Sequence, residues 1–156
     1  MCGAPNLPSS SKFPIAYVEI RVFSHATEDP EKVQTAVKNT LPESLANELK
    51  LTQTNVTGHH GNPIISLETK LNDKAALPFL LEKLATALSP LDKEHLCTEL
   101  DQHIERHNLY LRLDKQNAFL GTIKLASRDP IHFKIHFKNR AADEIQQICG
   151  QAGLLR

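Results

Sequence analysis

Hydrophobic and polar residues alternate in several short stretches of the chain, which is the pattern of half-buried β-strands. The clearest stretch covers residues 15–24 and has an aliphatic face made of Ala16, Val18, Ile20 and Val22. Residues 51–57 and 64–71 also read as strands, and the segment between them is rich in turn-forming glycine, asparagine and proline. We therefore expect a first strand and, later in the chain, a β-hairpin.

Three more strands are expected near the C-terminal end, over residues 109–114, 122–126 and 131–138, with a turn at Asp129-Pro130. Each of them alternates aliphatic or phenylalanine residues with polar ones. Strands that follow one another so closely in the sequence usually pair antiparallel, because short connections suffice to join them.

Helical spacing of apolar residues predicts the remaining elements. A short helix should begin at Pro30 with Asp29 as its N-cap, and Pro42 should end it or start a further turn over residues 43–49. A second helix should begin near Leu77. A third should follow Ser89-Pro90 with these residues inward: Leu96, Cys97, Leu100 and Ile104. A final helix is expected over residues 141–151. The order βα-ββ-αα-βββ-α predicts an α+β fold of two layers, with a mostly antiparallel sheet and helices on one face.

The length of 156 residues suits one domain. Residues 1–12 lack the features of a signal peptide and are expected to be a flexible tail, so that residues 13–156 form a single domain. No apolar run is long enough to span a membrane. Three cysteines without a CxxC spacing indicate reduced thiols in a cytoplasmic protein. We expect no cofactor.

The net charge of zero hides an uneven distribution. Residues 1–105 contain 9 basic and 14 acidic side chains, whereas residues 106–156 contain 9 basic and 4 acidic ones. The last third of the chain is therefore a candidate basic surface.

Strand alternation places the polar side chains of the sheet on the face away from the helices. This outer face would carry cations interleaved with rings: Tyr17, Arg21, Phe23, Tyr110, Arg112, Lys124, His132, Lys134, His136 and Lys138. Phosphates bind cations, and unstacked bases stack on flat rings, so the combination suits RNA. An ordinary solvated sheet face is the alternative, since Lys, Arg and Tyr are common there.

The turn around His59-His60 allows three interpretations. The histidines could bind a metal ion with His25, Glu28 or Asp29, although no second ligand cluster has a recognisable spacing. The turn amides and imidazoles, with Asn62, could instead meet a phosphate or a base edge. A purely structural hairpin turn is equally compatible with the residues, because Gly58 and Gly61 permit a tight backbone.

Residues 112–116 close one strand and open a loop. Arg112 should point outward, and Lys115 and Gln116 could contact a phosphate and a base edge. Alternatively, Asp114 pairs with a neighbouring cation and caps a short turn. The chain has no P-loop and no nucleophile elbow, so the sequence gives no positive sign of an enzyme.

Four segments of the chain, RVFSHATEDPEKV, GHHGNPI, LRLDKQNAFLG and DPIHFKIHF, resemble a family of archaeal RNA-binding proteins described as predicted exosome subunits. The family's fold resembles the large-subunit ribosomal protein that binds 5S ribosomal RNA. The resemblance implies an archaeal cytoplasmic protein that works in RNA processing or near the ribosome. The residues that match the family's recurring polar positions are His59, His60, Asn62, Arg112, Asp114, Lys115 and Gln116.

The sequence thus favours a non-catalytic RNA-binding protein, with RNA and exosome or ribosome-related proteins as partners. The expected RNA-binding residues are Arg21, His59, His60, Asn62, Tyr110, Arg112, Lys115, Gln116, Lys124, Lys134 and Lys138. A protein-interaction subunit that docks through an acidic helical side is the main alternative. A metal-dependent hydrolase using His59 and His60 is the other.

Overall fold

The computed structural model describes residues 14–58 and 61–155. Their elements, in chain order, are β1 (Ile15–His25), α2 (Pro30–Asn39), α3 (Glu43–Asn47), β2 (Thr52–Thr57), β3 (Pro63–Leu71), α4 (Leu77–Ala87), α5 (Pro90–Thr98), α6 (Leu100–His103), β4 (Ile104–Glu105), β5 (Asn108–Leu113), α7 (Lys115–Phe119), β6 (Ile131–Phe137) and α8 (Ala142–Ala152). None of the described helices is both long and apolar enough to cross a membrane.

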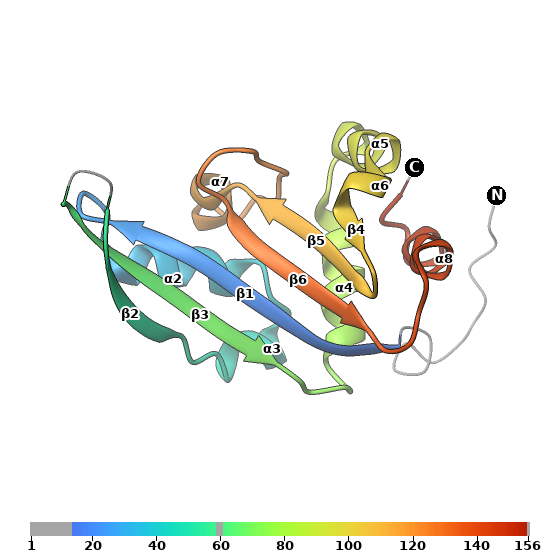
Figure 1. The fold of residues 1–156 in the computed structure, drawn as a ribbon, viewed down its shortest axis with the longest axis horizontal. Coiled ribbons are helices and arrows are strands. Elements are labelled where there is room, and N and C mark those ends of the chain that lie inside the picture. Colours follow the sequence, from blue (N-terminus) through green and yellow to red (C-terminus); the bar gives the residue numbers. More distant parts are fainter. Residues whose placement is uncertain (1–13, 59–60, 156) are drawn as a thin grey trace.

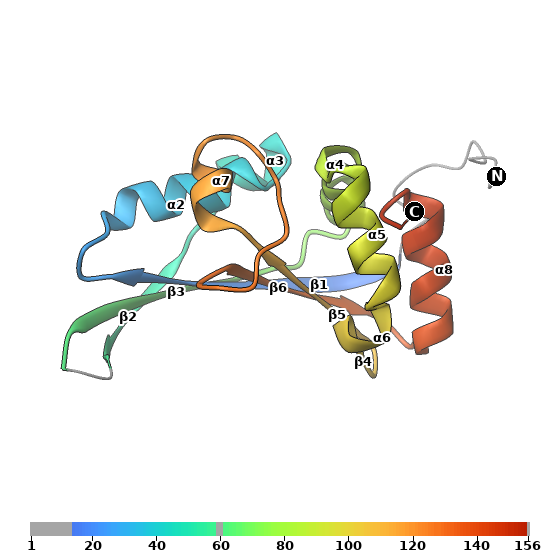
Figure 2. The ribbon, with the colours of Figure 1, turned by 90° about the horizontal axis from the view of Figure 1, so that it is seen from above.

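One six-stranded antiparallel sheet organises the described residues, with the strand order β2-β3-β1-β6-β5-β4. The long strand β1 lies near the middle, between β3 and β6 (Figure 1). When the sheet is viewed edge-on, helices α2, α3, α4 and α7 all lie on the same side of it (Figure 2). The predicted two-layer α+β architecture is confirmed. We call the opposite side of the sheet the open face, because none of the described helices covers its central strands.

Local signals in the sequence account for the helix starts. Asp29 caps α2 by accepting a hydrogen bond from the Glu31 amide at 3.0 Å, and Pro30 occupies the first helical position, where its missing N–H is not needed. Ser89 caps α5 in the same way through the Asp92 amide. The Asp29 cap confirms the sequence-based expectation, whereas for Ser89 the sequence predicted only that a new helix follows it.

The hairpin between β2 and β3 is confirmed, and its glycines are needed for two different reasons. A Cβ atom on Gly58 would lie 2.9 Å from Ile64 Cδ1 and 3.0 Å from the Asn62 carbonyl oxygen, so a larger residue would force the hairpin end to shift. Gly61 has a φ of +77°, in the left-handed region that favours glycine. His59 and His60 lie outside the described residues.

Side chains of the central strands alternate between the two faces of the sheet. The aliphatic residues of β1 that face the helices, Val18, Ile20 and Val22, are buried, while Arg21 on the open face is exposed. β5 and β6 follow the same rule, with buried and more exposed residues in alternation. The predicted parity is confirmed for β5, β6 and β1 from Tyr17 onward. At the start of β1 it is wrong, because an irregularity in the pairing between Ile15 and Tyr17 buries Ile15 in place of Ala16.

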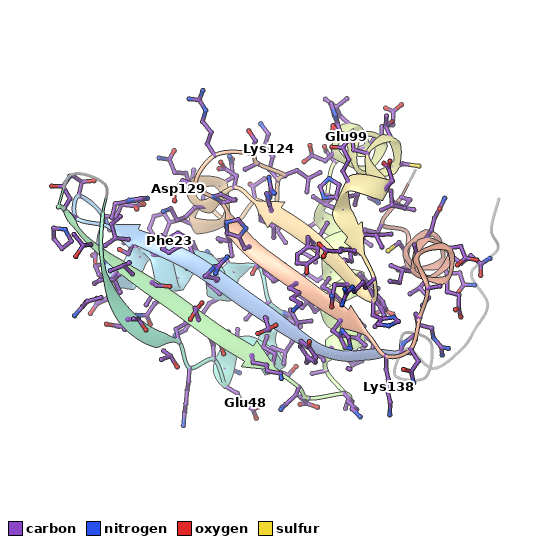
Figure 3. The ribbon with its side chains drawn as sticks, in the orientation of Figure 1. Phe23, Glu48, Glu99, Lys124, Asp129 and Lys138 are labelled. Carbon is purple, nitrogen blue, oxygen red and sulfur yellow. The ribbon has the colours of Figure 1, made fainter. Side chains whose placement is uncertain are left out.

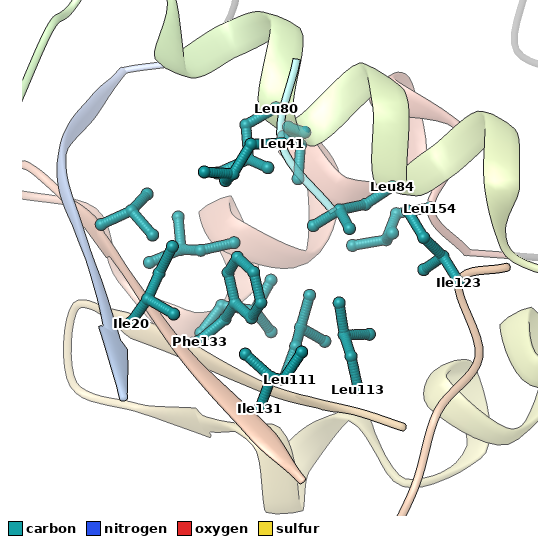
Figure 4. Packing of buried hydrophobic residues seen from close by; sticks show 14 of the residues in the cluster. Ile20, Leu41, Leu80, Leu84, Leu111, Leu113, Ile123, Ile131, Phe133 and Leu154 are labelled. Atoms are coloured by element: carbon teal, nitrogen blue, oxygen red, sulfur yellow. The ribbon is translucent and has the colours of Figure 1, made fainter. Parts of the chain in front are cut away.

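The core fills the space between this sheet and the helices (Figure 4). Phe133 of β6 packs there with Leu111 of β5 and Ile20 of β1, and all three are at most 1% exposed. From the helical layer, Leu80 and Leu84 of α4 complete the cluster. Burial of large aliphatic and aromatic side chains from both layers stabilises the packing of the helices on the sheet.

The strand expected over residues 122–126 is wrong. Asp114 accepts a hydrogen bond from the Asn117 amide at 2.8 Å and starts α7, so the chain leaves the sheet directly after β5. When it returns, only Leu125 forms an isolated bridge, to Leu113. Ile123 turns into the core instead. The capping role foreseen for Asp114 is therefore confirmed.

Two smaller expectations about the third predicted helix are also wrong. Cys97 is exposed, because it lies on the outer side of α5 while its neighbour Leu96 is fully buried. Ile104 belongs to the two-residue strand β4 and not to a helix.

Candidate nucleic-acid interface

The open face presents its side chains in rows that cross the strands, because residues paired in register lie side by side on one face. In the first row, Arg21 of β1 lies opposite His132 of β6, which lies opposite Arg112 of β5. Two guanidinium groups therefore flank one imidazole. Both arginines are exposed and His132 is half-buried.

The neighbouring rows contain rings and a paired carboxylate. Glu19, Lys134 and Tyr110 form the second row, and the Lys134 ammonium lies 3.3 Å from the Glu19 carboxylate. In the third row, Tyr17 stacks on His136, with ring centroids 4.6 Å apart.

Contacts from neighbouring strands hold this ring pair in place. His136 Nδ1 donates a hydrogen bond to Asn108 Oδ1 at 2.7 Å. On the other side, the Lys70 ammonium lies 4.2 Å from the centre of the Tyr17 ring, within cation–π range. The stacked rings of Tyr17 and His136 are thus fixed from both sides.

A groove of about 810 Å³ crosses the open face from β2 to β4. Its charged lining residues are not uniformly basic: Arg21, Lys70, Arg112, Lys134, Glu19, Glu68 and Glu105. The Glu68 carboxylate lies 4.0 Å from the Arg21 guanidinium, a weak and exposed ion pair. Four cations and three carboxylates thus share the groove, together with the rings of Tyr110 and His132.

Two histidines of the open face have lowered pKa values. Burial lowers the pKa of His132, and the positive charges of Arg21 and Arg112 lower it further. For His136, burial again lowers the pKa first, followed by repulsion from His107, Lys134 and Lys70. Both imidazoles are consequently neutral rings at pH 7, available for stacking and hydrogen bonding.

The structure brings together four of the residues that the sequence assigned to RNA: Arg21, Tyr110, Arg112 and Lys134. All four line the groove. Of the other seven, His59 and His60 lie outside the described residues. The remaining five are described one by one below.

Lys115 is buried, and this corrects its expected role as a phosphate contact. It is only 6% exposed, and its ammonium donates hydrogen bonds to the Phe23 carbonyl, Glu28 Oε1 and Asp129 Oδ2 at 2.8, 2.9 and 2.7 Å. All three of its donors are therefore used within the protein. Lys115 joins β1, the loop before α2 and the loop before β6.

Lys124 and Lys138 are exposed but lie outside the groove. Lys124 lies in the loop after α7 because the strand predicted there does not form, and Lys138 follows the last residue of β6. Figure 3 shows the two well apart, with Lys124 in the loop between α7 and β6 and Lys138 beyond the end of β6. Neither lines the groove as expected.

Gln116 and Asn62 are also separate from the groove. Gln116 lies on α7 and lines a second cavity, of about 460 Å³, between α2 and α7 on the helical side. Asn62 is exposed at the tip of the β2–β3 hairpin, at the end of the sheet (Figure 1).

The sequence suggested His25, Glu28 or Asp29 as metal ligands beside His59 and His60, and the structure describes the first three of these residues. Ligand atoms of His25, Glu28 and Asp129 lie within 4.8 Å of one another, so the acidic member is Asp129 and not the expected Asp29. The Lys115 ammonium already binds both carboxylates of this group. A cation of the protein itself thus occupies the position between them, and this cluster is an ion-pair network.

Sequence reasoning missed several lining residues of the groove: Glu68, Lys70, Gln102 and Glu105. The alternation of residues 64–71 contained a usable signal, because Glu68 and Lys70 have the same parity. That these two residues lie beside Arg21 and Glu19 depended on the pairing of β3 with β1, which the sequence pattern does not encode.

Comparison with known proteins gives consistent results. A protein-family profile described as RNA binding matches residues 17–137. The RNA-binding protein PAB1135 of Pyrococcus abyssi is 34% identical over 124 residues, which are 78% of this chain and 80% of that protein.

Solved structures share the fold. Mth689 of Methanothermobacter thermautotrophicus, a DUF54 protein, superposes with a TM-score of 0.72 at 29% identity, over 91% of this chain and 98% of the other. Protein SSO0741 of Sulfolobus solfataricus, also described as DUF54, gives 0.70 at 26% identity, over 87% and 96%. The profile and the relative from Pyrococcus abyssi show that the chain belongs to this RNA-binding family, whose solved members are described as DUF54 proteins.

Proposed function

We propose that this protein binds unpaired RNA in the groove across its open face, without catalysing a reaction. The observation that carries the proposal is the row in which Arg21 and Arg112 flank His132, with the ring of Tyr110 beside it in the same groove. Guanidinium groups bind phosphates, and rings stack on bases that are not engaged in a duplex. Membership of an RNA-binding family supports the proposal.

The number of cations in the groove determines how steeply RNA affinity should fall as the salt concentration rises. Counterion release on single strands gives a log–log slope of about −0.7 for each neutralised phosphate, so contacts from four cations correspond to a slope of roughly −3. Arg112 is the strongest single candidate, because it is exposed and, among the described residues, has no carboxylate within ion-pairing distance.

The test is RNA binding measured by fluorescence polarisation at several salt concentrations. We expect Arg112→Ala to weaken binding and to reduce the slope by about 0.7. Lys38→Ala is the matched control, because Lys38 is an exposed cation in the last turn of α2, on the helical side. An equal effect of both substitutions would contradict the assignment of the groove.

We further propose that the protein works with an RNA-processing or ribosome-related complex in the cytoplasm, and that the helical side makes the protein contacts. Phe119 and Leu120 are 40% and 76% exposed beside the cavity between α2 and α7, which supports this division of roles.

The measurement is affinity purification from the native host after nuclease treatment. Exosome or ribosomal proteins retained by the unaltered chain and lost with Leu120→Glu would support the proposal. Loss of all partners after nuclease treatment would contradict it.

A further inference from the structure

The β4 end of the groove contains a carboxylate that is unusual for a polyanion site. Glu105 is exposed and lines the groove, and among the described residues no cation lies within ion-pairing distance of it. Glu19 and Glu68, the other two acids of the groove, both have a cation partner. A free carboxylate repels phosphates, so its presence there is unfavourable for RNA unless it contacts a hydrogen-bond donor.

The residues around Glu105 supply the other parts of a base-binding pocket. Tyr110 offers a half-buried ring on the open face, and Gln102 of α6 adds an exposed amide to the same groove. His103 Nδ1 donates a hydrogen bond to the Tyr110 carbonyl at 2.9 Å, which ties the end of α6 to β5. Arg112 follows Tyr110 by two residues and therefore points to the same face.

We propose that this end of the groove selects guanine in the bound RNA. The base stacks on Tyr110, its N1–H and N2 amino groups donate to the Glu105 carboxylate, Gln102 reaches the base or sugar, and Arg112 contacts the adjacent phosphate. The inference rests on the proposed function, since it names the base that the RNA groove prefers.

The chemistry of the four bases explains the choice. On its Watson–Crick edge, guanine presents two adjacent N–H donors, which match the two oxygens of a carboxylate. Adenine and cytosine present one amino group beside a ring nitrogen that accepts and so repels the carboxylate. Uracil presents one N–H between two carbonyl oxygens. Only guanine can therefore use both carboxylate oxygens, and a bidentate contact of this kind discriminates by about 5- to 150-fold.

The exposed position of Glu105 places the expected preference at the lower end of this range, about 5- to 20-fold. The experiment uses the full chain and uridine hexamers with one central guanosine, inosine or adenosine, read by fluorescence polarisation. Inosine keeps N1–H and lacks the N2 amino group, so its affinity should fall between those of guanosine and adenosine.

Glu105→Gln is the decisive variant, and Asp101→Asn is its matched control, because Asp101 is an exposed acid on α6 that does not line the groove. We expect Glu105→Gln to weaken binding of the guanosine hexamer and to leave the uridine hexamer unchanged or tighter. Asp101→Asn should keep the guanosine preference. The salt dependence should be the same in both variants, since neither residue contacts a phosphate.

Three results would overturn the inference, and one of them would also overturn the proposed function. If the unaltered protein binds all hexamers equally, or if Glu105→Gln tightens all of them by the same factor, Glu105 only repels phosphate and the groove remains an RNA site without base preference. If the unaltered protein binds no hexamer at low salt, the proposed function fails as well.

Discussion

His132 lies between two guanidinium groups on the open face, and this position links RNA binding to pH. Arg21 and Arg112 flank it in register, and its pKa is lowered from the ordinary 6.5 by burial and then by these two charges. A phosphate placed over the row would offset the repulsion and raise the pKa again.

We therefore predict that RNA affinity rises as the pH falls from about 7.5 to about 6, because the complex binds a proton that the free protein does not. His132→Asn should reduce this pH dependence. His136, whose pKa is also lowered, would account for the part that remains. Fluorescence polarisation at constant ionic strength gives the measurement, and an affinity independent of pH would contradict the prediction.

The stability of the free protein should change with pH in the opposite direction. The folded state holds His132 below its unfolded pKa, so the unfolded state binds more protons in the window below about 6.5. The free energy of unfolding is expected to fall as the pH drops through this window. Urea denaturation at pH 7.5 and 5.5 tests this, and His132→Asn should show the smaller loss.

At the scale of elements, the ammonium of Lys115 connects segments that are distant in the sequence. It binds the end of β1 through the Phe23 carbonyl, the loop before α2 through Glu28, and the loop before β6 through Asp129. His25 adds a contact of 3.0 Å to Asp129. The network thus fixes the end of β1 against α7 and the entry to β6.

Lys115→Met should destabilise the protein by roughly 2 kcal/mol, since it removes three charge-assisted hydrogen bonds and leaves two carboxylates without their cation. The loss of stability is moderate because water still reaches Glu28 and Asp129, whose side chains are 29% and 39% exposed. Thermal or urea unfolding gives the measurement.

Gln116→Ala is the control for this experiment, because Gln116 is the exposed neighbour on the same helix. Its stability should stay within about 0.5 kcal/mol of the unaltered protein. If Lys115→Met leaves stability unchanged but weakens RNA binding, Lys115 contacts RNA and the structural role assigned to it is wrong.

The cysteines of α5 and α8 differ in burial. Burial in α8 raises the pKa of its thiol to about 12, whereas Cys97 on α5 is exposed. The sequence predicted that Cys97 faces inward, because it lies in a helical apolar pattern. Only packing determined that Cys149 joins the core and Cys97 does not.

At the scale of the whole molecule, the described helices cover one face of the sheet and leave the central strands of the other face open (Figure 2). The rings of the open face, Tyr17, Phe23, Tyr110, His132 and His136, can stack only on bases that are not already stacked in a duplex. The carboxylates between them disfavour the dense, regular phosphates of a double helix.

We predict that the protein binds a single strand of RNA at least tenfold more tightly than the same strand annealed to its complement, because stacking contributes about 1–3 kcal/mol per base. Competition binding at fixed salt measures the ratio. Tyr110→Ala should reduce the preference. Equal affinity for the two forms would indicate a phosphate-only surface.

The sequence by itself determined the alternation of β5, β6 and most of β1, the cap of α2, and the two-layer α+β class. These features depend on periodicity and on contacts between residues close in the chain, and both can be read locally. The resemblance of four segments indicated the RNA-binding family. Two expectations stay predictions: the similarity of fold to the ribosomal protein that binds 5S ribosomal RNA, and the flexible tail over residues 1–12.

Only the tertiary structure decided which charged residues share a surface. The pairing of β3 with β1 brought Glu68 and Lys70 into the groove, and the early start of α7 kept Lys124 out of it. Lys115 turned inward because its three acceptors come from segments between 14 and 92 residues away. A sequence pattern sets the direction of a side chain relative to its own strand or helix, but its partners depend on how distant elements pack.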